Sequence, residues 1–280
     1  MTIGSLRNEG MKRLSEAQVA DASIDAALLL EHVMDISRSY LLAHPDEEAD
    51  EAVCEAYLSL IGRRCEHVPP QHLTGTQEFM GLVFKVDKDV LIPRQDTECL
   101  VEEAMIETGD GMRVLDLCTG SGCILISLMR YKNDIYGVGT DISADALKVA
   151  ADNARTNGVS AVFKQGDLYG ALEDEDKFDI IISNPPYIRS DVIPSLMEEV
   201  RLYEPHTALD GGPDGLDFYR RIIDGAAAWL IPGGCILFEI GFDQAEEVSD
   251  LLKEAGYTGI SVIKDLAGND RVVKARSRSL

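Results

Sequence analysis

The C-terminal two-thirds of the sequence alternates between short apolar runs and longer amphipathic stretches. The runs RVLDL (113–117), IYGVGTD (135–141) and FDIIISN (178–184) have the length and the β-branched content of buried strands. The stretch 143–158 carries alanine and leucine on one helical face and charged residues on the other. Such alternation is typical of a mostly parallel sheet with helices on both faces, so we expect an α/β fold. Further helices are expected at 123–131, 215–230 and 244–256, and further strands at 161–167, 234–241 and within 260–275.

The first 72 residues show only helical patterns. The segment 23–34 is apolar around nearly its whole circumference, which predicts a helix buried among other helices. The segment 47–67 begins with acidic residues and ends with basic ones, as the helix dipole favours. We therefore expect a separate helical domain at residues 1–72.

The chain changes character after this domain. Residues 78–92 alternate between apolar and polar side chains, which predicts a β-hairpin. A helix follows, with Asp96 or Thr97 as its expected N-cap and acidic residues in its first turn. The expected organisation is a helical domain at 1–72, a β-hairpin linker at 73–92 and a second domain at 93–280.

The chain carries a formal net charge of -23 at pH 7. This charge argues against direct nucleic-acid binding, because phosphate contacts need Lys and Arg, and it favours a basic protein partner. No apolar run approaches the roughly 20 residues of a membrane-spanning helix. The six cysteines and five histidines show no zinc-site spacing. We expect a monomeric cytoplasmic protein without a metal site.

The loop after the run 113–117 has the features of a ligand site. The sequence VLDLCTGSGCI places Asp116 near the end of the expected strand, and Gly120 and Gly122 at the start of the next helix. Ligands of open parallel sheets bind at the carboxyl ends of strands, and glycines let the backbone approach them closely. A dinucleotide fingerprint would need glycine in place of Leu125, and a phosphate loop would need Gly-Lys-Ser/Thr, so the NAD and ATP interpretations both weaken.

Two more acidic residues end the next two expected strands. Asp141 ends the second strand, where a carboxylate can accept hydrogen bonds from both hydroxyls of a ribose. Asp167 ends the third, within reach of an adenine amino group. Together with Asp116 and the glycine loop they suit S-adenosylmethionine, a nucleoside without a pyrophosphate, whose positive sulfonium favours an acidic pocket.

The fourth expected strand stops abruptly in ISNPPYI (182–188). Asn184, Pro185, Pro186 and Tyr187 cannot continue a strand, because consecutive prolines remove two backbone donors. NPPY in this position resembles the motif of class I S-adenosylmethionine methyltransferases that act on amino groups of adenine, cytosine or glutamine amides. The motif alone leaves adenine and glutamine equally open.

Four other segments narrow the resemblance. They are HLTGTQEFMGLVFKV (72–86), LIPRQDTE (91–98), EVRLYEPHTALDGGPDGLDFYRRI (199–222) and LAGNDRVV (266–273). With NPPY, they resemble the protein-(glutamine-N5) methyltransferases that modify class I peptide chain release factors, over about residues 71–273 and in outline over the helical domain.

This resemblance implies both a fold and a reaction. The fold would be the Rossmann-like class I methyltransferase fold, with a mostly parallel seven-stranded sheet and a small N-terminal helical bundle that recognises the substrate. The reaction would transfer a methyl group from S-adenosylmethionine to the amide nitrogen of the glutamine in the Gly-Gly-Gln motif of a release factor. Cofactor contacts are expected from Cys118, Thr119, Gly120, Ser121, Gly122, Asp141, Asp167, Leu168 and Asn184.

The resemblance also assigns roles to the NPPY residues. The side-chain carbonyl of Asn184 and the backbone carbonyl of Pro185 would accept the two N–H groups of the substrate amide, with proline holding its carbonyl in place. Pro186 would stiffen the turn, and Tyr187 would pack its ring on the amide. Asn184, Pro185 and Tyr187 are therefore the expected catalytic residues, and all four residues are expected to bind the substrate.

One departure from the family pattern lies in the glycine loop. The family sequence D-x-G-x-G-x-G has glycine where this chain has Cys118. A positive φ there would cost a cysteine about 1 kcal/mol or more, so we expect a backbone that accommodates a small side chain.

Two alternatives remain open at this point. A glutamine methyltransferase acting on a ribosomal protein is close to the first interpretation. A DNA adenine-N6 methyltransferase shares NPPY, but it would flip a base and need a phosphate-binding surface. We also expect Phe79 to border the site, Glu204 and Pro205 to lie in a loop over it, and Arg94 either to order the pocket or to form a structural ion pair.

Overall fold

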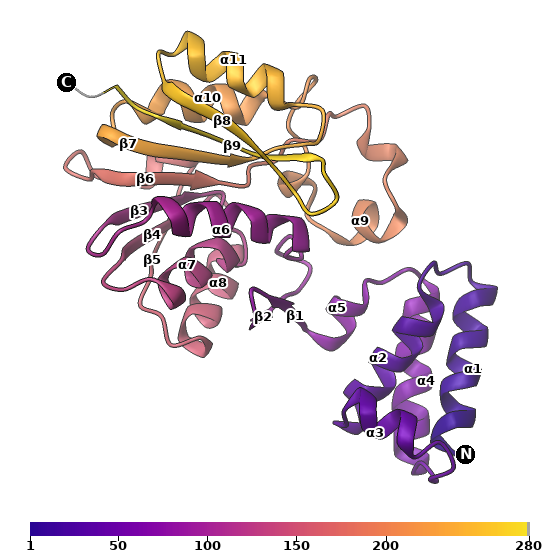
Figure 1. The fold of residues 1–280 in the computed structure, drawn as a ribbon. Coiled ribbons are helices and arrows are strands. Elements are labelled where there is room, and N and C mark those ends of the chain that lie inside the picture. The colour runs from indigo at the N-terminus through magenta and orange to yellow at the C-terminus, as the bar shows by residue number, and fades with distance from the viewer. Residues whose placement is uncertain (279–280) are drawn as a thin grey trace. The chain divides into compact units, whose positions relative to one another are not determined.

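A computed structural model of the chain describes residues 1–278 (Figure 1). The last two residues of the expected second domain, 279 and 280, lie outside the described residues. The chain divides into two compact units. Unit 1 comprises Met1–Thr76 and Met197–Tyr203, and unit 2 comprises Gln77–Leu196 together with the chain from Glu204 onward.

Unit 1 is built from helices. Helix α2 (Ala22–Met34) packs its apolar residues into the core of this unit, as its composition predicts, and Leu29 and Leu30 are fully inaccessible to solvent. Its one buried acid, Asp25, accepts a hydrogen bond from Arg64 Nε at 2.7 Å, and the same guanidinium reaches Glu199 at 2.6 Å. This ion-pair network holds α9 against the other helices. The helices are α1 (Ile3–Glu16), α2 (Ala22–Met34), α3 (Arg38–Ala43), α4 (Glu51–Cys65), α5 (Pro70–Thr74) and α9 (Glu198–Tyr203).

Unit 2 contains a seven-stranded sheet with the strand order β5-β4-β3-β6-β7-β9-β8. Neighbouring strands from β5 to β7 run parallel, and β9 is antiparallel to both β7 and β8. The expected mostly parallel α/β sheet is therefore confirmed. The strands are β3 (Arg113–Leu117), β4 (Tyr136–Asp141), β5 (Val162–Gln165), β6 (Phe178–Ser183), β7 (Leu230–Glu239), β8 (Thr258–Lys264) and β9 (Asp270–Arg276), with the separate pair β1 (Thr76–Phe79) and β2 (Leu82–Lys85).

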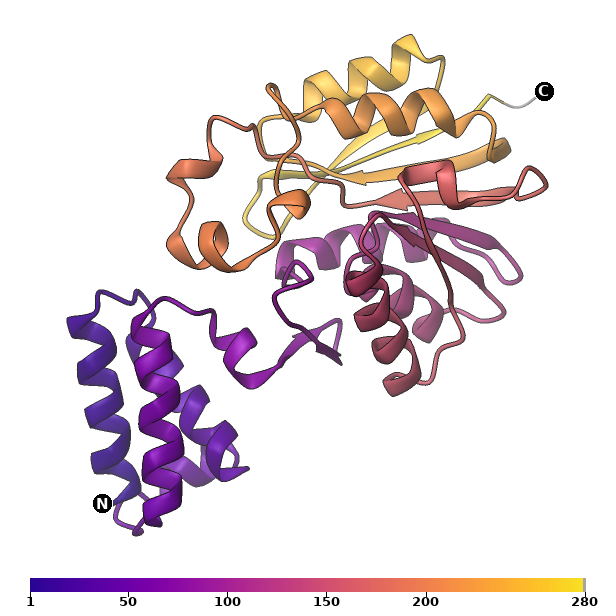
Figure 2. The same ribbon diagram turned by 180° about the vertical axis from the view of Figure 1, so that it is seen from behind.

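Helices cover both faces of the sheet (Figures 1 and 2). Alternate residues of β3 enter different cores: Leu115 packs in the core with α10 and α11, whereas Val114 packs with α6 and α7. Burial on both faces explains why the central strands read as continuous apolar runs. The helices are α6 (Glu98–Glu107), α7 (Cys123–Tyr131), α8 (Ala144–Thr156), α10 (Asp217–Ala226) and α11 (Ala245–Glu254), with short 3-10 turns η1 (Gln95–Thr97), η2 (Leu168–Ala171), η3 (Ile193–Ser195) and η4 (His206–Ala208).

The expected hairpin and helix start are both present, with two differences of detail. The hairpin β1–β2 ends at Lys85, because Val86 and Val90 pack against Ala146 and Val149 of α8. Thr97 is the N-cap residue of α6, as expected, but its side chain makes no capping hydrogen bond; it lies in the 3-10 turn η1, and its hydroxyl accepts a bond from Asn184 instead.

The register of the parallel strands brings their carboxyl ends to one edge of the sheet. Leu117 pairs with Thr140 on one side and with Ser183 on the other. The loops that follow β3, β4 and β6 are therefore neighbours in space, although they lie far apart in the sequence.

Candidate cofactor and substrate site

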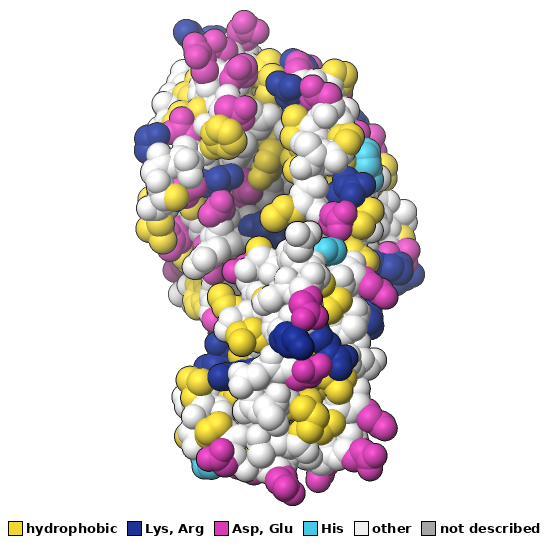
Figure 3. Space-filling view, turned by 90° about the vertical axis from the view of Figure 1, so that its right-hand side faces the viewer, with side chains coloured by type: hydrophobic (Ala, Val, Ile, Leu, Met, Phe, Trp, Pro, Cys, Tyr) yellow, Lys and Arg dark blue, Asp and Glu magenta, His cyan; other side chains and the backbone are white. Residues whose placement is uncertain are grey.

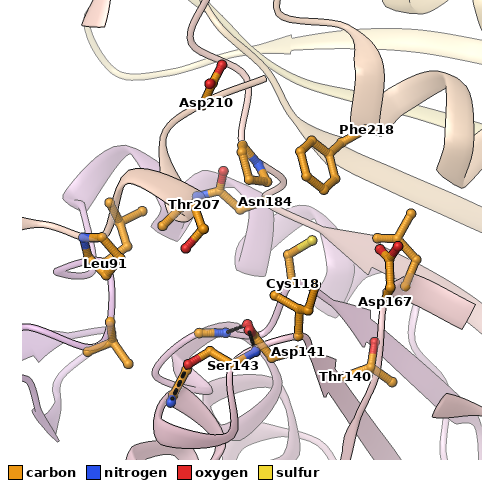
Figure 4. Close-up of a pocket in the computed structure, with 18 of the residues that line it drawn as sticks. Leu91, Cys118, Thr140, Asp141, Ser143, Asp167, Asn184, Thr207, Asp210 and Phe218 are labelled. Carbon is orange, nitrogen blue, oxygen red and sulfur yellow. Dashed lines mark hydrogen bonds between the residues drawn. The ribbon is translucent and has the colours of Figure 1, made fainter. Parts of the chain in front are cut away.

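A cavity of about 360 Å³ opens at this carboxyl edge (Figure 4). Figure 3 shows the surface of unit 2 hollowed, with hydrophobic and acidic side chains around the hollow. The cavity wall combines five loops that follow strands with one face of α10. The residues that line it include Gly120, Cys118, Asp141, Asp167, Leu168, Asn184, Pro186, Pro205, Asp210, Phe218 and Arg221.

The loop after β3 turns back on itself and presents its backbone to the cavity. The N–H of Thr119 donates to the Thr140 carbonyl at 3.0 Å, and the N–H of Gly120 donates to Asp141 Oδ2 at 2.9 Å. Cys118 has a φ of 59°, and its thiol faces the cavity (Figure 4). The expectation of a backbone suited to a small side chain is therefore wrong: the cysteine occupies the left-handed region, where a β-carbon is disfavoured.

Asp141 stands where the first two loops meet. Its Oδ1 accepts the N–H of Ser143 at 2.9 Å while its Oδ2 accepts that of Gly120. Burial raises the pKa of Asp141, and hydrogen bonds from backbone N–H groups oppose that rise. Each carboxylate oxygen keeps a second lone pair that can accept a ligand hydroxyl.

Asp167 lies on the wall after β5 and is paired with a cation. Its Oδ2 accepts a hydrogen bond from Arg221 Nη2 of α10 at 2.6 Å. The Arg221 guanidinium lies 5.6 Å from the centroid of the Phe218 ring. A ligand that binds Asp167 therefore contacts a carboxylate already paired with Arg221, next to the Phe218 ring.

The α10 contribution was missed by sequence reasoning. Phe218 and Arg221 lie three residues apart in α10, with Phe218 partly buried against the core and Arg221 exposed. Both side chains line the cavity, and an aromatic residue beside an arginine at the edge of an amphipathic helix is the available sequence signal.

The structure brings two of the three strand-end acids to the cavity, but not Asp116. Asp116 is fully buried beneath the loop, and the Thr119 hydroxyl donates to its Oδ2 at 2.6 Å. Burial raises the pKa of Asp116 to about 7, against the opposing effect of that hydrogen bond. Asp116 therefore supports the loop from inside the protein.

Several other expected site residues also lie behind the wall. Thr119 and Ser121 are buried, and Gly122 begins α7 with a φ of 78°. A β-carbon at Gly122 would lie 2.8 Å from Ile126 Cδ1, so close helix packing requires glycine there. Within residues 1–278 the cavity lining does not include these three positions, nor Pro185 and Tyr187.

The NPPY loop is divided between the cavity and the interior. Asn184 and Pro186 line the cavity, whereas the Tyr187 hydroxyl donates to Glu239 Oε1 at 3.3 Å. The Tyr187 carbonyl accepts the side-chain amide of Gln244 at 3.0 Å. The structure thus places the Tyr187 ring beside the cavity, not on its wall.

Asn184 is held by the residue expected to cap α6. Its Nδ2 donates to Thr97 Oγ1 at 3.4 Å. Glu239, a buried acid at the end of β7, accepts a hydrogen bond from the Tyr187 hydroxyl of the same loop. Burial raises the pKa of Glu239 to about 7, and the neighbouring Thr97, the charge of Arg271 and the Tyr187 hydroxyl oppose that rise.

Glu239 is the second group that sequence reasoning missed. It ends the apolar run CILFE, and it is 2% exposed. An isolated acid inside such a run is the available signal, because buried carboxyls are rare unless they are paired or functional.

Residues 209–212 pack against the backbone of the NPPY loop (184–187) and of Ile188, which follows it. The N–H of Ile188 donates to the Leu209 carbonyl at 3.0 Å, and the N–H of Gly211 donates to the Ile188 carbonyl at 2.8 Å. A β-carbon at Gly211 would lie 2.7 Å from the Cα of Tyr187. Glycine at position 211 therefore allows the two backbones to touch.

The remaining expectations have mixed outcomes. Phe79 does not border the site: it is 1% exposed and packs edge-on against Phe84. Arg94 forms an ion pair, with its Nη2 2.5 Å from Glu204 Oε1. Pro205 lines the cavity, as expected of a loop over the site.

Comparisons with known proteins identify the family. A family model of the PrmC N-terminal domain matches residues 5–75, and one of the methyltransferase small domain matches residues 95–200. A release factor glutamine methyltransferase of Clostridium acetobutylicum is 44% identical over 256 residues, which cover 90% of each chain. The enzyme of that name from Clostridium botulinum is 41% identical over 281 residues, 99% of each chain. This chain belongs to the release factor glutamine methyltransferase family.

The family resemblance drawn from the sequence is thereby confirmed, and with it the expectation of a methyltransferase enzyme. A solved methyltransferase structure from Pyrococcus furiosus shares the fold, with a TM-score of 0.55 and 18% identity. The alignment covers 71% of this chain and 90% of that one. The seven-stranded sheet of this family member is therefore a methyltransferase fold.

Residues 1–278 contain no group of three or more His, Cys, Asp or Glu side chains arranged to hold a metal ion. In the same part of this methyltransferase, no helix has the length and apolarity to cross a membrane.

Proposed function

We propose that the protein transfers a methyl group from S-adenosylmethionine to the side-chain amide nitrogen (N5) of the glutamine in the Gly-Gly-Gln motif of class I peptide chain release factors. The observation that carries this proposal is the placement of Asn184. Asn184 lines the cavity and donates one amide N–H to Thr97, which leaves its acceptor Oδ1 available to a ligand. An acceptor fixed there suits an amide N–H donor.

Several groups at the cavity support S-adenosylmethionine as the bound cofactor. A β-carbon at Gly120 would meet no atom within 4 Å, so a ligand can reach that backbone directly. Asp141 offers two oxygens to ribose hydroxyls, and the Phe218 ring offers a face for a purine to stack on. Asp141 and Asp210 add negative charge that favours a cation. The bound cofactor supplies an electrophilic methyl group on a positive sulfur.

The NPPY loop would orient the acceptor nitrogen. An amide nitrogen is a poor nucleophile, because its lone pair is delocalised into the carbonyl. The Asn184 side-chain oxygen and the Pro185 backbone carbonyl would bind its two N–H groups and direct the remaining lobe at the methyl group. A carbon–nitrogen bond forms as the sulfur–carbon bond breaks, and the extra proton leaves the nitrogen for water. No strong base is needed for this order of events.

The choice of substrate rests on the relatives and on charge. The similar Clostridium proteins are named release factor glutamine methyltransferases. The net charge of -23 disfavours DNA and favours a basic protein surface. We assign substrate recognition to the helical domain at 1–72, the connection to the hairpin segment 73–92 and catalysis to 93–280, in a protein that acts as a monomer in the cytoplasm.

The test is a labelling experiment with four acceptors. The protein is incubated with methyl-labelled S-adenosylmethionine and, in parallel, a class I release factor, its Gly-Gly-Gln glutamine→alanine variant, ribosomal proteins and duplex DNA. Label is expected on the unaltered release factor alone. Label on DNA, preferential label on a ribosomal protein, or equal label on the glutamine→alanine variant would overturn the proposal.

A further inference from the structure

A buried asparagine on α8 connects the β-hairpin to the glycine loop. The side chain of Asn153 lies in the interior, where the residue is 1% exposed. Its Oδ1 accepts the backbone N–H of Lys85 at 2.7 Å, and its Nδ2 donates to the Lys85 carbonyl at 3.1 Å. The same Nδ2 donates to the Ser121 carbonyl at 2.9 Å. One side chain therefore holds both the backbone of β2 and the backbone of the loop after β3.

The chemistry of these partners fixes the orientation of the amide. The oxygen of Asn153 faces an N–H group and its NH₂ group faces two carbonyls, so turning the amide over would oppose like groups at each contact. With Lys85 the amide exchanges the same pair of hydrogen bonds that a neighbouring antiparallel strand would make. The second N–H of the amide is then directed at the glycine loop.

The bond to Ser121 matters because of where its carbonyl lies in the loop. The peptide that joins Ser121 to Gly122 is bonded at both ends: its carbonyl accepts from Asn153, and its N–H donates to the Thr119 carbonyl at 2.8 Å. Glycine adopts positive and negative φ about equally, so Gly122 by itself would let this peptide turn over. Asn153 removes that freedom and keeps the loop in the form that presents Gly120 to the cavity.

We infer that Asn153 is a positioning residue for the cofactor loop, which couples the docking of the hairpin to the affinity of the site for its cofactor. Within residues 1–278 the cavity lining does not include Asn153 or any residue of β1 and β2, so the effect is indirect. Coupling between two sites is reciprocal, so cofactor binding is expected to stabilise the hairpin in turn. The effect on the cofactor rests on the proposed function, whereas the link between loop and hairpin belongs to the protein alone.

The same helix supplies a matched control one turn further on. Asn157 Nδ2 donates to the Val83 carbonyl at 3.1 Å, so this residue also holds the backbone of β2. It donates to the Asn153 carbonyl as well, at 3.0 Å, and in the part of the chain that the structure describes it makes no hydrogen bond to the glycine loop. Asn157→Ala therefore releases the hairpin at one point and leaves the side-chain bonds of Asn153 in place.

The first test uses hydrogen exchange of the full chain without cofactor. Asn153→Ala should speed exchange of the Gly122 N–H roughly 10-fold, the effect of one lost hydrogen bond, because the peptide is then held at one end only. Exchange of the buried Ile181 N–H in β6 reports any general loss of stability. In Asn157→Ala the Gly122 rate should stay within about twofold of the wild type. Equal Gly122 exchange in the wild type and Asn153→Ala, relative to Ile181, would overturn the inference.

The second test measures the cofactor. By calorimetry, Asn153→Ala is expected to bind S-adenosylmethionine roughly 10-fold more weakly, and Asn157→Ala within about twofold of the wild type. With the release factor as substrate, the loss should appear in the KM for the cofactor, with kcat nearly unchanged at saturating cofactor. A purely structural role would reduce the fraction of folded enzyme, and so kcat, and would leave KM unchanged. That pattern, or an unchanged Kd, would overturn the inference.

A third measurement needs no substitution, so it does not depend on the folding of a variant. In the wild type labelled with ¹⁵N-asparagine, the Asn153 side-chain NH₂ signal is assigned by nuclear Overhauser contacts to Lys85 and Ser121. Saturating S-adenosylmethionine should shift this signal and slow its exchange, and it should leave the Asn157 side-chain signal in place. An Asn153 signal that does not respond to bound cofactor would overturn the inference.

Failure of the proposed function has a different signature. A wild type that binds no S-adenosylmethionine by calorimetry, while Gly122 still exchanges faster in Asn153→Ala, would overturn the proposed function and leave the link between hairpin and loop standing. A wild type that binds the cofactor and methylates the release factor, together with an Asn153→Ala variant of unchanged affinity, would overturn the inference and leave the proposed function standing.

Discussion

The loops after β3 and β6 lie side by side at one edge of the sheet, yet they are held by different means. In the loop at 118–122, Cys118, Gly120 and Gly122 all have positive φ, and backbone N–H groups tie the loop to β4 and Asp141. None of residues 184–187 has a positive φ. There, two prolines limit the backbone and side chains from η1, β7 and the segment after β7 hold the rest.

Each loop is also backed by a buried carboxyl that accepts a hydroxyl from the loop. Asp116 accepts the hydroxyl of Thr119 in the first loop. Glu239 accepts the hydroxyl of Tyr187 in the second loop. The difference lies in what each carboxyl supports: a glycine-rich backbone turn in the first loop, and the large Tyr187 side chain in the second.

Removing the amide from the second loop should have the largest effect. Asn184→Ala is expected to lower the rate of methyl transfer by roughly 10²- to 10³-fold, because one preorganised acceptor is lost. Cofactor affinity, measured by calorimetry, should change far less. Asn133→Ala, which alters an exposed loop residue, is the matched control. Near-normal methyl transfer in Asn184→Ala would contradict the assignment of the NPPY loop to the substrate amide and of the glycine loop to the cofactor.

The next effect concerns stability and pH. Glu239 has a pKa of about 7 in the folded protein against 4.5 for an ordinary glutamate. The folded state therefore binds the extra proton between these values, so this group favours folding at low pH, and the contribution is lost as the pH rises through 7. Glu239→Gln removes the dependence and should raise the free energy of unfolding at pH 8 by roughly 3 kcal/mol relative to the wild type.

Urea denaturation of Glu239→Gln and the wild type at pH 5 and pH 8 measures this difference. The variant should be clearly the more stable protein at pH 8, with a much smaller difference at pH 5. An equal difference at both pH values would show that Glu239 does not titrate in this window and that the carboxyl behind the second loop stays in one protonation state.

A smaller effect is expected at the carboxylate that serves the first loop. In the wild type, the two Asp141 oxygens accept the N–H groups of Gly120 and Ser143 and remain available to ribose hydroxyls. Asp141→Asn replaces one of these acceptor oxygens by an NH₂ donor. We expect S-adenosylmethionine to bind about 10-fold more weakly, with the maximal rate nearly unchanged at saturating cofactor. A fall in the maximal rate with normal affinity would instead assign Asp141 to the chemistry of the second loop.

The smallest effect tests the strained backbone of the first loop. Cys118 has a φ of 59°, so Cys118→Gly should raise the free energy of unfolding by up to about 1 kcal/mol, because glycine adopts this conformation without steric cost. Cys118→Ala removes the thiol but keeps the β-carbon, and it should give no such gain. Equal stabilities of the two variants would show that the contrast in backbone strain between the loops is unimportant.

Local pattern predicted most of the fold. The run 113–117 coincides with β3 and the stretch 123–131 with α7, because burial on both faces gives strands an apolar run and one buried face gives helices a 3.6-residue period. The predictions failed where distant groups compete for a residue. Thr97 occupies the N-cap position of α6, but its hydroxyl accepts a bond from Asn184 and not from a helix N–H, and no local pattern reports that distant partner.

The sequence by itself determined the strand–helix alternation, the glycine loop, the acids at the strand ends and the rigid NPPY turn, because each depends on neighbours along the chain. Only the tertiary structure decided which of these groups reach the cavity. It turned Asp116 and Tyr187 away, added Phe218 and Arg221 from α10, and bonded the Tyr187 hydroxyl to the buried Glu239. The physical reason is the parallel register of the strands, which gathers their carboxyl ends at one edge of the sheet. Because side chains alternate between the two faces of a strand, a shift of one residue moves a side chain from the cavity into the interior.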